Sequence, residues 1–241
     1  MTRPVVMLLA AVLFPTPSRV TAQSLADLKY RVSADGHYMN GNLQRWYSNT
    51  RLNLTLSNTL VAFTVAPSLI YGQAGRVVYE REVLVAGTTQ LFPEDQFFAH
   101  ATVAFDVSKR NKIESRWQSG AGMGINILRI QEHSVSLWHA FIYEDTQFNV
   151  VEGNQTWRSS FRLKGLHQLF ERVIVVTYDT YVQPSIQQSS DVRWRVVVSL
   201  EFPITKALSF RTTVDNSHES VVLTGRKQDD LRWTFGVSVG N

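Results

Sequence analysis

Apolar and polar residues alternate with a period of two over residues 112–128. One set contains Ile113, Ser115, Trp117, Ser119, Ala121, Met123, Ile125 and Ile127, and the other contains Glu114, Arg116, Gln118, Gly120, Gly122, Gly124 and Asn126. This period predicts an extended strand whose side chains point alternately to two opposite faces. The alternation lasts roughly three times as long as an ordinary strand of about 5–6 residues. A strand this long, apolar on one face and polar on the other, is typical of a transmembrane β-barrel.

The same alternation recurs along most of the chain and predicts an all-β protein. We expect further strands over residues 28–38, 46–56, 61–71, 77–91, 97–107, 135–143, 157–169, 172–182, 192–202, 208–214 and 231–239. Together they make about twelve strands, an even number, as in bacterial outer-membrane barrels. Pro67 interrupts the third of them and marks a bulge or an unpaired position, because proline cannot donate to a β-ladder.

The connections between these segments differ in length and composition. Short turns are expected near Asn58, Glu94, Glu132, Gln168 and Lys206, and longer loops, richer in charge or amide groups, near Gly75, Asn111, Val150, Gln187 and Leu223. Short turns at one end and long loops at the other are typical of an antiparallel up-and-down transmembrane barrel with its short turns in the periplasm. A soluble β-barrel that binds an apolar ligand would turn its apolar face inward and has no reason to sort its connections.

The first residues resemble a secretory signal peptide. Arg3 supplies a positive start, an apolar run follows, and Val20-Thr21-Ala22 gives a cleavage site of small residues. We therefore expect a signal peptide over residues 1–22, cleaved after Ala22, and a single β-barrel domain over residues 23–241. No other apolar run reaches the ~20 residues of a transmembrane helix.

Composition adds little to the choice of fold but limits the classes of partner that the protein could bind. The chain has no cysteine and a net charge of +4, which falls to +2 when Arg3 and Arg19 leave with the signal peptide. A balance so close to neutral argues against nucleic acid as a partner. The expected partners are outer-membrane lipid, the barrel-assembly machinery during insertion, and a small anionic solute.

The chain also resembles the bacterial family of salt-induced outer-membrane proteins, a domain of unknown function. The resemblance rests on Gly41-Asn42 after the first strand, the Gly-Ala-Gly-Met-Gly run within 116–124, the strand at 137–145 and the closing hairpin at 211–236. It implies an outer-membrane β-barrel and carries over no catalytic residue. One position departs from the pattern: such barrels commonly end in an aromatic residue, and this chain ends in Asn241.

The glycine run contains a GxG, but a phosphate-binding loop needs a strand-to-helix turn and no helix follows. We interpret Gly120, Gly122 and Gly124 instead as space on the inward face, across which neighbouring arginine or aromatic side chains lie. No cofactor is expected.

The six histidines have no spacing typical of a metal site, so a metal site would have to be assembled across strands. His139 shares its face with Leu137, Phe141 and Tyr143, and a lipid-facing imidazole is unusual. We expect the alternation to slip there, so that Trp138, Ala140 and Ile142 face outward. The alternative is an outer-membrane-embedded hydrolase, for which His139 would need a Ser or acid partner nearby in space.

Charged residues fall in the inward phase of most strands and give the best candidate site. The candidate lumen-lining residues are Arg31, Arg51, Arg116, Arg162, Lys164, Arg193, Arg195, Arg211, Glu80, Glu82, Glu114 and Glu201. Charges at bilayer depth are tolerated only in a wet or packed interior, where they pair. They form either a narrow channel with a mild anion preference or an ion-pair network that fills the barrel and gives it a structural or envelope-stress role. Neither reading is an enzyme.

Overall fold

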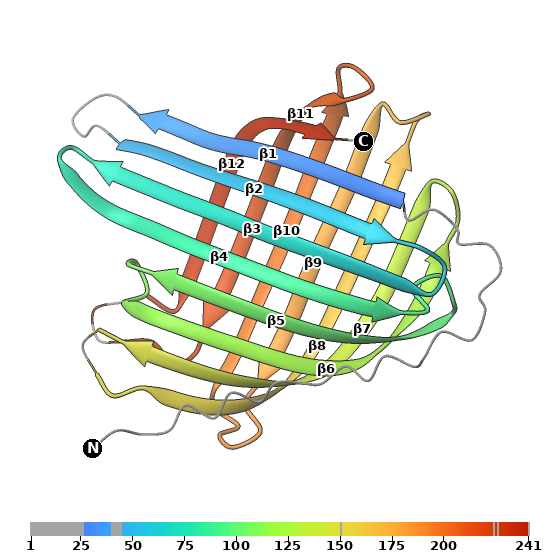
Figure 1. Ribbon diagram of the computed structural model, residues 1–241. Helices are drawn as coiled ribbons and strands as arrows, with labels where there is room; N and C mark the ends of the chain where they lie inside the picture. Colours follow the sequence, from blue (N-terminus) through green and yellow to red (C-terminus); the bar gives the residue numbers. More distant parts are fainter. Residues whose placement is uncertain (1–26, 40–44, 150, 224, 226, 241) are drawn as a thin grey trace.

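Twelve antiparallel strands form a closed barrel in the computed structural model, which describes residues 27–39, 45–149, 151–223, 225 and 227–240 (Figure 1). The strands are β1 (Asp27–Met39), β2 (Arg45–Ser57), β3 (Val61–Ala74), β4 (Val77–Leu91), β5 (Phe97–Ser108), β6 (Ile113–Arg129), β7 (His133–Phe148), β8 (Asn154–Leu169), β9 (Ile174–Pro184), β10 (Val192–Pro203), β11 (Leu208–Glu219) and β12 (Asp229–Gly240). The all-β class, the number of strands and the antiparallel barrel are as the sequence predicts. No helix of the described residues has the length and hydropathy that a membrane crossing needs.

Each strand pairs with the next along the chain, and β1 closes the barrel by pairing with β12. In Figure 1, β1 to β6 form one wall and β7 to β12 cross behind them. Among the described residues the closing seam has six residue pairs, from Arg31↔Gly240 to Gly36↔Phe235. By contrast, β1 and β2 pair along thirteen positions.

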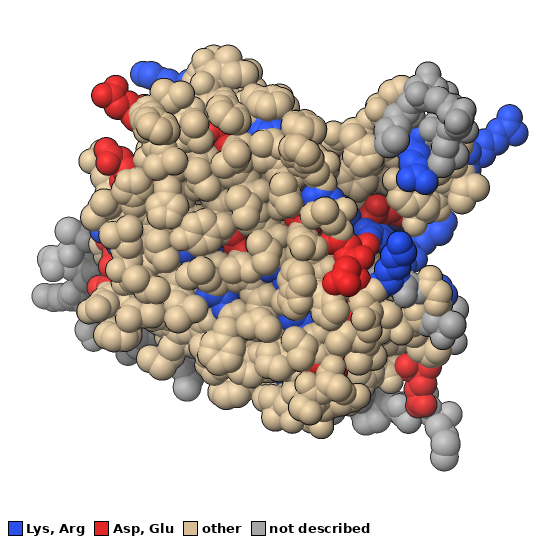
Figure 2. Space-filling model, turned by 180° about the vertical axis from the view of Figure 1, so that it is seen from behind, with Lys and Arg blue, Asp and Glu red and all other residues tan. Residues whose placement is uncertain are grey.

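The predicted alternation separates an apolar outside from a polar inside. On β6, Trp117 is 60% exposed and Met123 is 64% exposed, whereas Arg116 and Gln118 lie in the opposite phase and line the interior. The broad outer face in Figure 2 carries few charged side chains, and those that are visible gather mainly toward the ends of the molecule. An apolar outside is what lipid contact requires, and it is the reverse of a soluble barrel around an apolar ligand.

The alternation of inward and outward side chains is interrupted where the β-ladder between two strands is irregular. Bulges interrupt the β6–β7 pairing between Ile113 and Ser115 and again between Asn126 and Leu128. Because an extra residue at a bulge shifts the phase of the strand, Ile113 is buried and Glu114 is exposed, the opposite of the prediction. Pro67 follows the predicted pattern: it pairs with Val85 of β4 but has no partner on β2.

The connections lie at two ends, which we call the turn end (58–60, 92–96, 130–132, 170–173 and 204–207) and the loop end (75–76, 109–112, 149–153, 185–191 and 220–228, with the β1–β2 connection). The predicted sorting is correct, but the difference in length is smaller than expected. The connection at Gly75 has only two residues, and Gln168 lies within β8 rather than in a turn. Only the 185–191 and 220–228 connections are clearly longer than the turns.

Aromatic side chains form a ring on the outside near the loop end. Contacting pairs from neighbouring strands include Trp46 with Tyr71, Phe105 with Trp117, and Tyr143 with Trp157, with ring centroids 5.2, 4.7 and 5.2 Å apart. Their position near strand ends is that of an interfacial girdle. The predicted signal peptide and Asn241 lie outside the described residues.

The glycines of β6 make room for neighbours, as expected, but only one neighbour is aromatic. A Cβ on Gly124 would lie 2.1 Å from the ring of Phe98, whereas at Gly120 and Gly122 it would meet the β7 backbone at 2.6 and 1.8 Å. The glycine run lies within β6, which continues as a strand to Arg129.

Candidate functional site

The barrel encloses a cavity of about 960 Å³ whose lining comes from every strand. Ten basic side chains line it, Lys29, Arg31, Arg51, Arg116, Arg162, Lys164, Arg193, Arg195, Arg211 and Arg232. Six acidic side chains do so among the described residues, Glu82, Asp106, Asp179, Glu201, Glu219 and Asp230. The surface that meets the cavity therefore carries more positive than negative groups.

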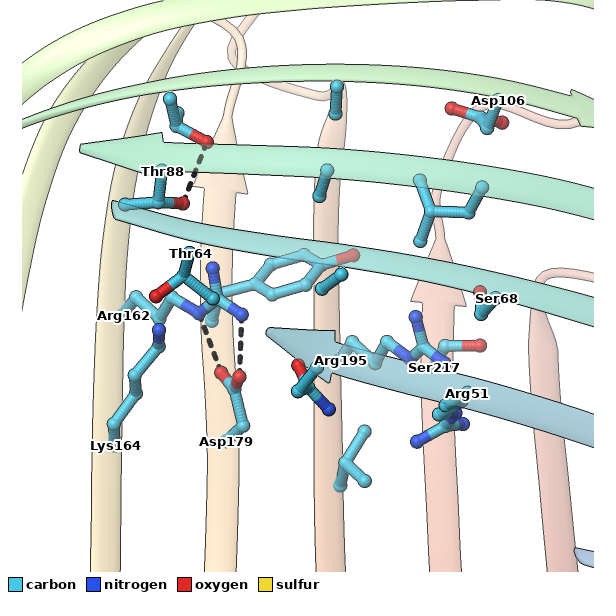
Figure 3. A pocket seen from close by; sticks show the side chains of 18 of the residues that line it. Arg51, Thr64, Ser68, Thr88, Asp106, Arg162, Lys164, Asp179, Arg195 and Ser217 are labelled. Atoms are coloured by element: carbon cyan, nitrogen blue, oxygen red, sulfur yellow. Dashed lines mark hydrogen bonds and ion pairs between the residues drawn. The ribbon is translucent and has the colours of Figure 1, made fainter. Parts of the chain in front are cut away.

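Charges alternate around one side of the cavity at mid-height, with one residue from each of several strands (Figure 3). Arg162 of β8 donates two hydrogen bonds to Asp179 of β9, at 2.6 and 2.5 Å. Arg195 of β10 makes the same bidentate contact with Asp215 of β11, at 2.8 and 2.6 Å. Arg51 of β2 adds a third cation 3.6 Å from Asp215, so this belt has three cations for two carboxylates.

Hydroxyl groups from β3, β4 and β5 lie on the opposite wall of the cavity. Thr64 of β3, Thr88 of β4 and Thr102 of β5 present hydroxyl groups there, with alanines between them, and the hydroxyls of Thr88 and Thr102 lie 3.4 Å apart. The cavity therefore has a charged side and a hydroxyl-bearing side.

Two of the cations that line the cavity have no carboxylate within ion-pair distance among the described residues. Lys164 lies over the Trp138 ring, with its Nζ 4.3 Å from the centroid. It stands opposite Asp179 in the ladder, but Arg162 occupies both oxygens of that carboxylate. Arg211 donates to the hydroxyls of Thr213 and Ser199, at 3.0 and 2.8 Å. Neither cation makes an ion pair of its own within the described residues, although Asp179 lies near Lys164, and Asp35 and Glu201 lie near Arg211.

Ion pairs cross the cavity near the loop end. Arg232 of β12 contacts Glu80 of β4 at 2.5 Å, and Arg110, from the connection between β5 and β6, contacts both Glu80, at 3.1 Å, and Asp230 of β12. Arg116 of β6 reaches Glu219 of β11 at 3.6 Å. These pairs narrow the passage at the loop end.

A second cluster of charged side chains at the loop end is buried inside the barrel. Glu144 of β7 accepts a hydrogen bond from Arg193 of β10 at 2.7 Å and lies 3.6 Å from Arg158 of β8. Arg158 also donates to both oxygens of Asp191, at 3.2 and 2.9 Å. Because charges taken out of water are stable only when paired, this cluster holds β7, β8 and β10 in place.

Ten of the twelve candidate residues proposed from the sequence line the cavity, and the other two do not. Glu80 points into the barrel but is buried, with its carboxylate held by Arg110 and Arg232. Glu114 is exposed on the far side of the β6 bulge, so its assignment to the interior is wrong. The arginines also pair with acidic residues that are not among the candidates from the sequence: Asp106, Glu144, Asp179, Asp191, Glu219 and Asp230. For those of these acidic residues that lie within strands, the inward phase of the alternation could have identified them.

His139 faces outward, and the expected slip of the alternation does not occur. Trp138, Ala140 and Ile142 are buried instead, because β7 keeps its phase through this region. The His139 ring lies between Phe141 and Phe161, with centroids 5.0 and 4.6 Å away, and its Nε2 is 3.0 Å from the Ser159 hydroxyl. The serine partner that a hydrolase would need is thus present, but in the described part of the chain no contact joins His139 to a carboxylate.

No group of three or more His, Cys, Asp or Glu able to hold a metal ion occurs among the described residues.

This fold, a closed barrel with an apolar outside and a charged interior, is that of the outer-membrane porins. The chain belongs to the family described as "Protein of unknown function, DUF481", whose model matches residues 32–240. No curated protein has significant sequence similarity to it.

Solved structures share the architecture at low sequence identity. The NanC porin is 11% identical, covers 87% of this chain and 98% of its own, and superposes with a TM-score of 0.56. The KdgM porin in complex with disordered oligogalacturonate is 11% identical, with 88% and 97% covered and a TM-score of 0.47. The outer membrane channel DcaP of Acinetobacter baumannii is 7% identical, with 90% and 97% covered and a TM-score of 0.46. The likeness to NanC shows a common fold and nothing of the solute.

Proposed function

We propose that the protein is a narrow channel of the bacterial outer membrane that passes small anionic solutes. The observation that carries the proposal is the excess of cavity-lining cations, two of which, Lys164 and Arg211, form no ion pair within the described part of the chain. Fixed positive charge in a narrow passage with low-dielectric walls acts on a permeating ion with little screening. Rings of Arg and Lys select anions in this way.

The apolar outside supports the membrane location. Exposed Leu, Val, Phe and Trp side chains on the strands, such as Leu28, Phe63 and Trp233, suit contact with lipid and not with water. The predicted signal peptide supplies export, and insertion would use the barrel-assembly machinery. NanC is described as a porin, and the shared fold supports a channel.

The size of the solute follows from the crossing ion pairs. Three ion pairs reach across the lumen at the loop end and narrow the passage there: Arg232–Glu80, Arg110–Asp230 and Arg116–Glu219. A small anion would pass between the charged belt and the wall of Thr64, Thr88 and Thr102, which offers hydroxyl groups to a hydrated or hydroxylated solute.

The hydrolase alternative has weaker support. His139 and Ser159 lie in hydrogen-bond contact on the outward face, but two phenylalanine rings flank the imidazole and no contact to an acid orients it among the described residues. An activated serine needs a base that is itself oriented by a third group. Failure of a fluorophosphonate probe to label Ser159 would exclude this alternative.

The channel is tested by recording purified, refolded protein in a planar bilayer under a KCl gradient. We expect discrete conductance steps and a reversal potential that reports a modest anion preference. Lys164→Gln and Arg211→Gln should each move the reversal potential toward the cation side. Lys206→Gln is the matched control, because Lys206 is an exposed residue of a turn that does not line the cavity, and it should change nothing.

A silent bilayer, or a reversal potential that Lys164→Gln and Arg211→Gln leave unchanged, would contradict the channel. The charged interior would then be an ion-pair network with a structural or envelope-stress role, which is the alternative interpretation given by the sequence. The salt-induced family that the chain resembles suggests a separate experiment: if the protein has an envelope-stress role, its amount in the outer-membrane fraction should rise when cells grow in added salt.

A further inference from the structure

Two histidines face each other on the outside of the barrel at the turn end. His133 begins β7 and stands directly opposite His167 of β8 in the ladder. Their Nδ1 atoms lie 3.2 Å apart, with ring centroids 5.3 Å apart and the rings inclined by 44°. Both side chains are half-buried, and neither lines the cavity.

The second nitrogen of His167 is already held by a neighbour. Its Nε2 lies 3.3 Å from the hydroxyl of Tyr178 on β9, and the two rings stack with centroids 5.6 Å apart. Metal-binding histidines characteristically have their other ring nitrogen bonded to a polar partner, which fixes the tautomer and the orientation of the ring. If Tyr178 accepts the Nε2 proton, the lone pair of His167 Nδ1 points toward His133.

The separation of the two nitrogens suits a shared metal ion. Zinc binds imidazole nitrogen at about 2.0–2.1 Å, so two such bonds at a right angle place the nitrogens about 2.9 Å apart and at the tetrahedral angle about 3.4 Å apart. The observed 3.2 Å lies between these values. A direct N–H···N bond between the rings fits the same distance but needs a proton on one Nδ1, which zinc would displace.

We propose that His133 and His167 bind a divalent transition metal of the kind that prefers imidazole, with Zn²⁺ as the test ion and water in the remaining positions. The site lies outside the lumen and does not depend on the proposed channel. Because no third His, Cys, Asp or Glu of the described chain joins the pair, the site is more open than a structural zinc site. Bound metal would tie together the turn ends of β7 and β8, which the chain connects only at the other end, through 149–153.

Isothermal titration calorimetry tests the site. The refolded full chain is first freed of metal with a chelator and then titrated with ZnCl₂. We expect one equivalent of Zn²⁺ per chain. His133→Gln and His167→Gln should each weaken binding by at least about tenfold, and Tyr178→Phe, which keeps the ring and removes only the hydroxyl, by roughly 10–100-fold. His218→Gln is the matched control, since His218 pairs with Asp229 at the loop end, and it should bind as the wild type does.

Unchanged zinc affinity in both histidine variants, or no zinc bound by the wild type, would overturn the proposal. Heat-modifiable migration of unboiled samples in gels shows whether each variant is folded. His133→Cys gives a second arm, because a thiolate is also a zinc ligand: it should retain binding where His133→Gln loses it. A cysteine variant no better than the glutamine variant would count against direct coordination.

Discussion

Arg116 of β6 and Glu219 of β11 lie 3.6 Å apart across the lumen, although four strands separate them on the shorter way round the barrel. Arg116 does not depend on Glu219 for an ion pair, because it also makes a bidentate contact with Asp106, at 2.8 and 3.0 Å. The contact therefore spans the passage without being required to hold β6 in place.

Glu219→Gln should widen this point of the passage. The variant removes the attraction across the lumen and leaves Arg116 with Asp106, so single-channel conductance should rise while stability changes by less than about 1 kcal/mol, as for other partly exposed pairs. Planar-bilayer recording measures the first and urea unfolding in lipid vesicles the second. Glu94→Gln is the control, because Glu94 pairs with Arg129 outside the cavity. Equal conductance of Glu219→Gln and wild type would show that this contact does not limit flow.

Val196→Arg should destabilise the barrel. Val196 lies outward in the middle of β10, between the inward Arg195 and Val197, so a charge there would enter the apolar layer. The expected loss in the free energy of unfolding is roughly 2–4 kcal/mol at mid-bilayer depth. Leu231→Arg at the loop end of β12 should cost only about 0–1 kcal/mol, since it lies near the interface. Similar losses at both sites would argue against a membrane-embedded barrel.

Gly124→Ala should also destabilise the barrel, by about 1–3 kcal/mol, as overpacking does. The added Cβ would overlap the Phe98 ring, which is wedged against Trp138 at a centroid distance of 4.8 Å. Phe98→Leu in the same chain should recover part of the loss. Gly87→Ala makes a suitable comparison, because its Cβ would meet only a methyl group of Val103 at 3.3 Å. Equal unfolding midpoints for the two alanine variants would refute the packing argument.

Glu171→Gly should stabilise the protein. Phe170, Glu171 and Arg172 form three consecutive left-handed residues in the β8–β9 turn, with φ of 53°, 55° and 69°. Such a conformation costs an L-residue about 1–2 kcal/mol, a cost that glycine avoids. Because glycine also has more entropy to lose on folding, the net gain should be about 1 kcal/mol or less. Glu132→Gly, in a turn position without positive φ, should instead lower the unfolding midpoint; a loss of stability at Glu171 as well would contradict the expectation.

Period-two alternation was sufficient to predict most of the fold, because lipid on one side and polar groups on the other impose it on every strand. The prediction was wrong where the backbone departs from a regular ladder: at Glu114 a bulge shifts the phase, and a pattern that assumes two residues per repeat contains no sign of it. At His139 the opposite error occurred. The strand keeps its phase, because Ser159 and two phenylalanine rings give the imidazole a local partner that the sequence order does not reveal.

The sequence predicts which charged side chains point into the barrel better than it predicts which of them form ion pairs. Arg162 and Asp179 lie on adjacent strands, but the register places Lys164 opposite Asp179, so Arg162 reaches that carboxylate only diagonally. Arg31 and Glu201, at 2.6 Å, are 170 residues apart and meet only because the barrel closes. The same holds for Arg232 and Glu80, whose contact depends on barrel radius and strand tilt. Which cations remain without a carboxylate is therefore a property of the closed barrel.

The short pairing between β1 and β12 sets how the barrel opens. Six residue pairs of the described chain hold this junction, and the strands that form it are the first and last of the barrel. Amide protons at Val32, Ala34, Val237 and Val239 should therefore exchange with deuterium sooner than those in the middle of the β6–β7 ladder, because local opening requires fewer hydrogen bonds to break there. A chain that lost its last residues would have no strand to complete the cylinder, and its edge would be left to pair with whatever strand lay nearest in the bilayer.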